Sequence, residues 1–206
     1  MTSPRPHDLL RVSTTATDVL SDDAPSWVKG ALQAAPWVVV RRAFAPEGLI
    51  AVGVRGRDRS HRYAWAIQRD DVRETVAPED LADVAPQPGR EVAAMRALST
   101  VRAPLIETGL VWGPTGSVGF ELASGTPTAT PDSDLDLVIR VPSLPTALDR
   151  LDALHRRLSR LNVRIDCQVE THSGAIALAE LLSEGDDVLV KTPHGPSLVR
   201  RSVAVS

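Results

Sequence analysis

The sequence predicts an α+β protein in which a small N-terminal α/β domain is followed by a mixed sheet flanked by helices. Two observations predict the elements: short alternating apolar runs typical of strands occur in both halves, and segments with an apolar residue every three or four positions lie between them. A third predicts the division, because the stretch from Asp70 to Pro88 is polar, contains three prolines and is expected to be a linker. We therefore place an N-terminal domain at 1–76, a linker at 77–89 and a second domain at 90–206.

Composition excludes several classes of protein. The chain of 206 residues has 43% hydrophobic and 24% charged residues, as ordinary globular proteins do. Its net charge of −3 argues against a nucleic-acid-binding protein. Cys167 is the only cysteine, so neither an internal disulfide nor a cysteine-based zinc site is expected. The N-terminus lacks an apolar signal segment and no apolar run is long enough to cross a membrane, so we expect a cytoplasmic protein.

The N-terminal domain is expected to combine a helix with several strands. Residues 25–35 are predicted to form a helix that has Trp27 and Leu32 on its apolar side and ends at Pro36. Residues 7–11 are expected to form a strand or a short helix. Three further segments are rich in β-branched or aromatic residues and are predicted to be strands: 37–42, 49–54 and 59–67.

A cluster of arginines occupies the turn between the last two of these strands. The turn has the sequence GVRGRDRSHR and carries Arg55, Arg57, Arg59 and Arg62. Such a cluster can be a solvated hairpin tip. Guanidinium groups also bind phosphate and carboxylate in a bidentate manner, so the alternative is contact with an anionic ligand or an acidic partner.

The second domain is expected to alternate helices and strands. The predicted helices are 90–101, which Pro104 ends, 144–161, with Pro145 in its first turn, and 173–184, with Ser173 as its N-cap. The predicted strands are 110–112, 135–139, 163–170, 187–192 and 197–203, of which the last two form a hairpin. A long helix between two strands suggests a crossover connection, although the sequence does not give the relative strand direction.

Two aspartates enter the second of these strands. Successive side chains of a strand point to opposite faces, so Asp134 and Asp136 share one face while the leucines between them face the core. Two adjacent carboxylates repel each other unless a cation lies between them. Mg²⁺ binds one or two carboxylates together with substrate phosphates and water, so this pair indicates phosphate chemistry.

Gly116 and Ser117 precede this pair and suit a phosphate. Glycine lets the backbone approach a ligand closely, and the N–H groups that begin a short helix at 118–124 attract anions. Gly125 is placed to end that helix. The alternative is that 113–117 is an ordinary tight turn and that the aspartates lie in a solvated loop.

These motifs resemble two nested families. Gly116-Ser117 followed by Asp134-x-Asp136 on a strand is similar to the signature of the nucleotidyltransferase superfamily that includes DNA polymerase beta, although the spacer is longer here. More narrowly, the phrases GPTGSVGFELASG and DSDLDL, together with PWVVVRRA and GVRGRDRSHR near the N-terminus, resemble the malonate decarboxylase holo-acyl-carrier-protein synthase family, also called phosphoribosyl-dephospho-CoA transferases.

The resemblance implies a reaction, a metal and a partner. It implies a nucleotidyltransferase-like second domain that binds Mg²⁺ through Asp134, Asp136 and a third carboxylate on a following strand, namely Asp166, with Glu170 as the rival at the same parity. The implied donor is 2'-(5''-triphosphoribosyl)-3'-dephospho-CoA, and the implied acceptor is a serine of the apo acyl-carrier subunit of malonate decarboxylase. The alternatives are another ATP-dependent nucleotidyltransferase, acting on a protein or a small molecule, and a non-catalytic binding module.

Overall fold

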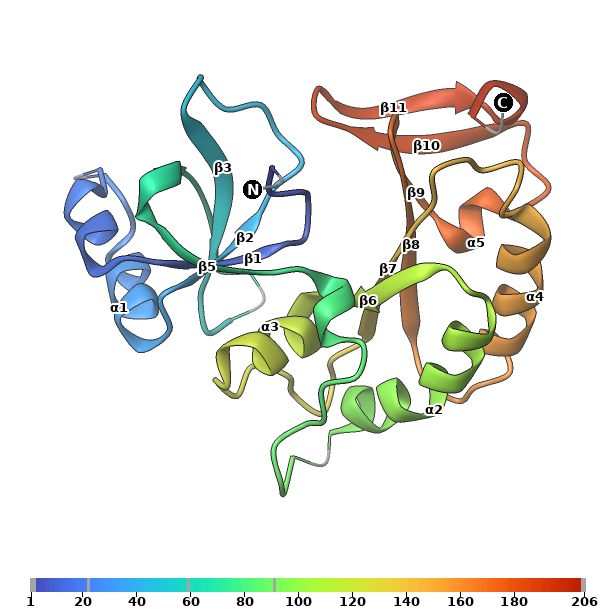
Figure 1. Cartoon of the computed structure of the whole chain (residues 1–206), viewed down its shortest axis with the longest axis horizontal. Coiled ribbons are helices and arrows are strands. Elements are labelled where there is room, and N and C mark those ends of the chain that lie inside the picture. The colour runs from blue at the N-terminus through green and yellow to red at the C-terminus, as the bar shows by residue number, and fades with distance from the viewer. Residues whose placement is uncertain (1–2, 22, 59, 91, 205–206) are drawn as a thin grey trace. The chain divides into compact units, whose positions relative to one another are not determined.

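The computed structural model describes residues 3–21, 23–58, 60–90 and 92–204, and the chain divides into two compact units, Met1–Ala77 and Pro78–Ser206. One unit contains a five-stranded sheet and the other a six-stranded sheet, both with helices, which confirms the predicted α+β class (Figure 1). No helix among the described residues is both long and apolar enough to span a membrane.

The first unit is an antiparallel sheet of strand order β4-β3-β2-β1-β5, and α1 (Ser26–Ala34) packs against it. Its core includes Val28 and Leu32 from the helix and Val38 and Val52 from the sheet. The predicted helix and strands are confirmed. The strands are β1 (Leu9–Val12), β2 (Trp37–Val40), β3 (Leu49–Arg55), β4 (Arg62–Gln68) and β5 (Val72–Val76), and short 3-10 helices span Thr14–Val19 and Arg69–Asp71.

Strand β5 corrects the linker predicted from Asp70 onward. It pairs with β1, and its three middle residues are exposed while Val72 and Val76 are half-buried. An edge strand with so little buried surface has the composition of a loop, which is why the sequence suggested a linker. Next along the chain, the 3-10 helix η3 (Pro78–Leu81) already belongs to the second unit.

The second unit is a mixed sheet of order β11-β10-β9-β8-β7-β6. Strands β7 and β8 are parallel, α4 is the crossover between them, and the other pairs are antiparallel. Helices α2, α4 and α5 lie on one side of this sheet (Figure 1). The strands are β6 (Val111–Pro114), β7 (Leu135–Arg140), β8 (Ile165–Thr171), β9 (Gly174–Ala177), β10 (Asp187–Thr192) and β11 (Gly195–Arg200); the helices are α2 (Ala93–Glu107), α3 (Gly116–Ser124), α4 (Leu148–Leu158), α5 (Leu178–Leu181) and α6 (Arg201–Ala204).

Helix η3 covers the other face of the sheet beside β6. Gly113 of β6 lies so close to η3 that a Cβ atom there would be 1.9 Å from the carbonyl oxygen of Pro78. Its register partner on β7 is Val138, which lies on the same face as Asp136. Glycine at position 113 therefore permits the close packing of η3 on the face that carries the aspartates.

Two predicted helix boundaries are wrong at prolines. Helix α2 continues through Pro104 to Glu107, because Val101 and Leu105 on either side are fully buried in the core and this burial outweighs the lost backbone hydrogen bond. Pro145 was expected in the first turn of the helix, but α4 begins only at Leu148.

The predicted helix at 173–184 is also wrong. Its first part is β9, which pairs with β8 and β10, and only Leu178–Leu181 is helical. Gly174 has φ +148°, and a Cβ atom there would lie 2.6 Å from the carbonyl oxygen of Lys191. Pairing in the sheet thus overrides the helical propensity of the alanine- and leucine-rich segment.

Candidate active site

The structure places Asp136 and Asp166 side by side on neighbouring strands. Asp134 directly precedes β7 and Asp136 is its second residue, while Asp166 is the second residue of β8. The parallel register pairs Asp136 with Asp166, so their side chains leave the same face of the sheet. Leu135, Leu137 and Ile139 of β7 are fully buried on the opposite face.

Glu170, the rival third carboxylate, lies elsewhere. It pairs with Arg140 in the same register and is only 6% exposed, whereas Asp166 is exposed. Four residues along a strand correspond to about 13 Å, so Glu170 begins far from Asp136. The register favours Asp166, rather than Glu170, as the carboxylate that could bind the same metal ion as Asp136.

The turn before α3 brings the backbone against Asp136. Gly116 has φ +59°, and a Cβ atom built on it would lie 1.8 Å from Oδ2 of Asp136. The N–H of Thr115 also donates to the carbonyl oxygen of Asp136 at 2.9 Å. The N-terminal end of α3 and the carboxylate of Asp136 therefore border the same space, and only glycine fits at position 116.

Helix α3 starts two residues earlier than predicted. Gly116 and Ser117 therefore form its first turn rather than preceding it, and Ser117 is 6% exposed. The N–H groups of a first turn have no partner within the helix and favour an anion. Gly125 caps the helix in the left-handed region at φ 70°, as predicted.

The donor atoms at this site suit Mg²⁺. Among the described residues no group of three or more His, Cys, Asp or Glu side chains is arranged to hold a metal ion. Mg²⁺ does not need such a group, because it usually binds one or two carboxylates and takes its remaining ligands from phosphates and water. A helix N-terminus that attracts phosphate beside Asp136 fits that pattern.

Arg164 is a residue of the site that sequence reasoning missed. Its Nε lies 3.5 Å from Oδ2 of Asp134, and its carbonyl oxygen accepts the N–H of Leu135. The Arg164 side chain is 81% exposed and that of Asp134 only 11% exposed. An exposed arginine therefore balances part of the charge of the more buried aspartate.

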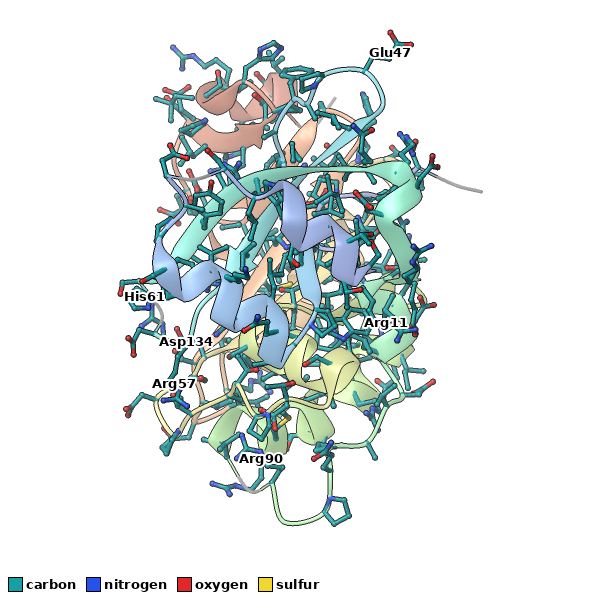
Figure 2. The ribbon with its side chains drawn as sticks, turned by 90° about the vertical axis from the view of Figure 1, so that its left-hand side faces the viewer. Arg11, Glu47, Arg57, His61, Arg90 and Asp134 are labelled. Atoms are coloured by element: carbon teal, nitrogen blue, oxygen red, sulfur yellow. The ribbon has the colours of Figure 1, made fainter. Side chains whose placement is uncertain are left out.

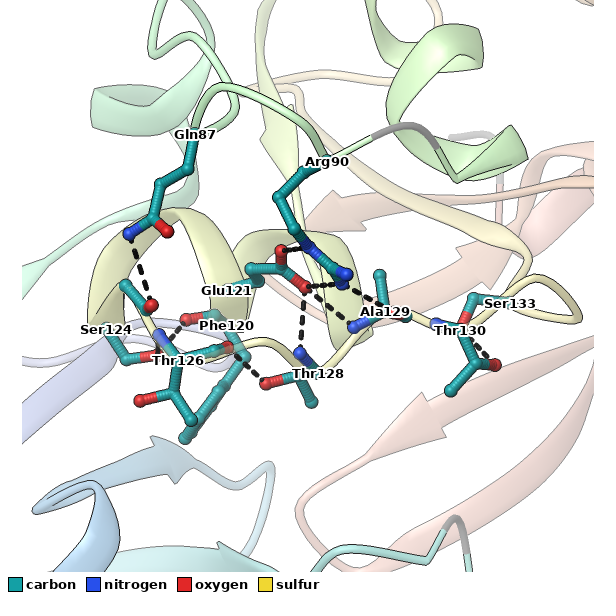
Figure 3. Close-up of polar contacts among 11 residues, drawn as sticks. Gln87, Arg90, Phe120, Glu121, Ser124, Thr126, Thr128, Ala129, Thr130 and Ser133 are labelled. Carbon is teal, nitrogen blue, oxygen red and sulfur yellow. Dashed lines mark hydrogen bonds and ion pairs between the residues drawn. The ribbon is translucent and has the colours of Figure 1, made fainter.

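Arg90 and Glu121 were missed as well, and they form a second polar cluster between helix α3 and the segment that follows it (Figure 3). Nε of Arg90 donates to Oε1 of Glu121 at 2.5 Å, and Nη2 of Arg90 donates to Oε2 at 2.9 Å. Burial alone would raise the pKa of Glu121, which is 5% exposed, but hydrogen bonds from Arg90 and from the N–H groups of Thr128 and Ala129 lower that pKa below its usual value. Glu121 is the only charged residue of helix α3, which is the signal in the sequence that could have identified it.

In the first unit, the β3–β4 hairpin carries the arginine cluster. Arg55 and Arg62 are direct register partners, so two positive charges lie opposite each other, and Arg57 at the tip is exposed (Figure 2). Arg59, also part of the predicted cluster, lies outside the described residues.

The tip of this hairpin is packed on α1. The rings of His61 and Trp27 stack with centroids 5.1 Å apart and an interplanar angle of 9°. Gly56 allows this contact, since a Cβ atom there would lie 2.4 Å from the Cβ of His61. Packing against α1 thus holds the segment that presents the arginines.

Comparisons with known proteins cover both units. A family model described as the phosphoribosyl-dephospho-CoA transferase MdcG N-terminal domain matches residues 5–78, and one described as the MdcG C-terminal domain matches residues 80–202. Proteins named phosphoribosyl-dephospho-CoA transferase from Pseudomonas putida and Pseudomonas aeruginosa are each 42% identical, over 100% and 95% of this chain and 98% and 92% of their own lengths. The protein of that name from Azotobacter vinelandii is 42% identical over 95% of this chain and 92% of its own length. No solved structure matches. Because the similarity extends through both units, the chain belongs to the phosphoribosyl-dephospho-CoA transferase family and is a transferase.

Proposed function

We propose that the protein transfers the phosphoribosyl-dephospho-CoA group from 2'-(5''-triphosphoribosyl)-3'-dephospho-CoA to a serine of the apo acyl-carrier subunit of malonate decarboxylase. The observation that carries the proposal is the approach of Gly116, at the start of α3, to the carboxylate of Asp136. This approach sets a phosphate-binding helix end beside a carboxylate, which suits a triphosphate bound with Mg²⁺.

The site residues have distinct roles in this reaction. Gly116 and Ser117 hold the terminal phosphates of the donor through the first turn of α3. Asp134 and Asp136, helped by Asp166, would hold Mg²⁺ once the donor phosphates complete the site, and the ion would supply positive charge to the attacking and leaving oxygens. The remaining acceleration comes from positioning the serine hydroxyl in line with the α-phosphorus.

Atoms and charges balance in a single displacement. The serine oxygen forms a bond to the α-phosphorus, the bond from that phosphorus to the β-phosphate bridging oxygen breaks, and pyrophosphate leaves. Asp166 accepts the serine proton, because it is the most exposed of the three aspartates and lies in register with Asp136. The product is a phosphodiester between the carrier serine and the prosthetic group.

Intact-mass measurement tests this function directly. The protein is incubated with Mg²⁺, the apo-carrier and either the triphosphoribosyl donor or ATP, and the carrier is then weighed. We expect a mass increase equal to the phosphoribosyl-dephospho-CoA group with the first donor and none with ATP. Addition of a nucleoside monophosphate from ATP would instead identify another nucleotidyltransferase, and an unchanged carrier in both reactions would contradict the proposal.

A further inference from the structure

We propose that Arg90 and Glu121 are positioning residues that fix the spacer between the phosphate-binding helix and the aspartate strand, and thereby the distance between the two halves of the active site. The proposal rests on the proposed function, because it assigns the two residues a part in that reaction. Neither residue carries a candidate ligand atom, so their action is through the spacer, which we define as residues 125–133.

Glu121 binds the backbone in the middle of the spacer. Its Oε2 accepts the N–H groups of Thr128 and Ala129, each at 2.8 Å, while both of its oxygens accept from Arg90. Arg90 also donates to the carbonyl oxygen of Ala129 at 2.8 Å. Charge-assisted hydrogen bonds with Arg90 and Glu121 therefore hold both N–H and carbonyl groups of the backbone in the middle of the spacer.

Further polar contacts occur near both ends of the spacer (Figure 3). Near its start, Nε2 of Gln87 donates to the carbonyl oxygen of Gly125 at 3.2 Å, and the N–H of Thr126 donates to Oγ of Ser124 at 3.1 Å. Near its end, the N–H of Thr130 donates to Oγ of Ser133 at 2.9 Å. The spacer is thus an ordered part of the unit.

The position of the Arg90–Glu121 pair, which we call the clamp, connects it to the reacting groups. Glu121 lies five residues after Gly116 on the same helix, and Ala129 lies five residues before Asp134. At the other end of α3, Gly116 and Thr115 touch Asp136 directly. Glu121 therefore joins α3 to the middle of the spacer, while Thr115 joins the start of the helix to β7. Loss of the clamp releases the spacer that leads into Asp134, which changes the position of the aspartates relative to the first turn of α3.

Conservative variants test this role. Arg90→Lys keeps the charge but loses the two-pronged fork, and Glu121→Gln keeps the shape but replaces one acceptor oxygen by a donor. For both we expect kcat to fall at least tenfold, the Mg²⁺ concentration for half-maximal rate to rise at least threefold, and KM for each substrate to change less than threefold.

The matched control is the ion pair of Arg157 with Glu107, which joins α4 to α2 and in which both side chains are about half exposed. Arg157→Lys should leave kcat, KM and the Mg²⁺ dependence within twofold of the wild type. Wild-type kcat and Mg²⁺ dependence in Arg90→Lys would overturn the proposal, and so would equal losses in the control.

Hydrogen–deuterium exchange supplies a readout that needs no activity. In the wild type, we expect the amides of Thr128 and Ala129 to be protected to the same degree as the Thr115 amide that bonds Asp136. In Arg90→Lys, we expect faster exchange not only in the spacer but also in 115–118 and 134–136. Unprotected Thr128 and Ala129 amides in the wild type would overturn the proposal even if neither variant folded.

The two proposals fail separately. If the wild type transfers nothing to the carrier, the proposed function is wrong, whereas the exchange experiment still decides whether the clamp fixes the aspartates. If transfer is observed but the faster exchange stops at the spacer, the clamp is only structural and the proposed function stands.

Discussion

At the scale of single residues, the pair Asp134 and Asp136 has the sharpest expected effect. Asp134→Asn or Asp136→Asn removes a negative charge while keeping the side-chain shape, so each variant should fold and lose several orders of magnitude in transfer rate. The check is the rate at saturating Mg²⁺ together with a thermal unfolding curve. A variant that retains more than about a tenth of the wild-type rate loses less than about 1.4 kcal/mol, which is too little for a metal ligand.

Asp166 and Glu170 offer a paired comparison on one strand. Asp166→Ala should reduce the transfer rate far more than Glu170→Ala, because only Asp166 is in register with Asp136. Glu170→Ala should instead lower stability, since Glu170 is 6% exposed and lies beside Arg140. Rates and urea unfolding of both variants separate these effects, and the reverse order of rates would show that the third carboxylate is Glu170.

Gly116 has a matched control in Gly109. Both have positive φ, +59° and +63°, but a Cβ atom at Gly116 would clash with Asp136 whereas nothing lies within 4 Å at Gly109. Gly109→Ala should cost about 1–2 kcal/mol in the free energy of unfolding, because it places a side chain in the left-handed region. Gly116→Ala should cost more, because the clash with Asp136 adds to the same backbone strain. Only Gly116→Ala should also reduce the rate, by at least about a hundredfold, or about 2.7 kcal/mol. Equal rates for the two variants would mean that the contact with Asp136 has no functional weight.

At the scale of elements, β8 carries a thiol on its core side. Burial, assisted by the nearby charge of Asp166, raises the pKa of Cys167 from 9.0 to about 12. The protonated form is therefore favoured in the folded state, so this contribution to stability is complete below pH 9 and is lost as pH rises toward 12, by up to about 1.4 kcal/mol per pH unit. Although Cys167 borders a cavity of about 180 Å³, iodoacetamide at pH 8 should modify it only after unfolding. Rapid modification of the folded protein, followed by mass, would contradict this expectation.

The elements also show where sequence reasoning succeeds. The strand that carries Asp166 was predicted from its alternation of apolar and polar residues, and the crossover helix α4 from its apolar residues at every third or fourth position. Both predictions are confirmed, because each pattern reports burial on one face of a regular element. The segment at 173–184 was mistaken for a helix, because its pairing with β8 and β10 is not visible in local composition. Helix α2 was cut short at Pro104, since the burial of Leu105 that carries the helix onward is a tertiary property.

The same distinction applies to the site. Gly116 and the aspartates were predicted because residue type and spacing are local signals, and the structure places Gly116 against Asp136. The partners Arg90 and Glu121 are 31 positions apart, and only the folded chain brings them together. The sequence therefore predicts the candidate reacting groups better than it predicts the residues that hold them in position.

At the scale of the whole molecule, the two units divide the chemistry from another task. The proposed phosphate-binding turn and all three candidate carboxylates belong to the second unit, whereas the arginine hairpin belongs to the first. The first unit has its own core and its own family match, so it is free to recognise something other than the reacting triphosphate. If the acceptor is an acidic carrier protein, the arginine hairpin suits it in charge.

Removal of this charge tests the division of labour. Arg55, Arg57 and Arg59 are changed together to Ser, and a control variant changes Arg150, Arg156 and Arg160 of the second unit to Ser, which removes the same charge elsewhere. Charges at the rim of an interface mainly set the rate of encounter and its sensitivity to salt. The hairpin variant should therefore raise KM for the carrier about tenfold, which corresponds to about 1.4 kcal/mol, and should weaken the dependence of this KM on salt. KM for the triphosphoribosyl donor should stay within about twofold of the wild-type value. The control variant should leave both KM values and the salt dependence unchanged.

Weaker donor binding with an unaffected carrier would show that the hairpin contacts the CoA portion of the donor instead, and carrier docking would then have to involve another surface.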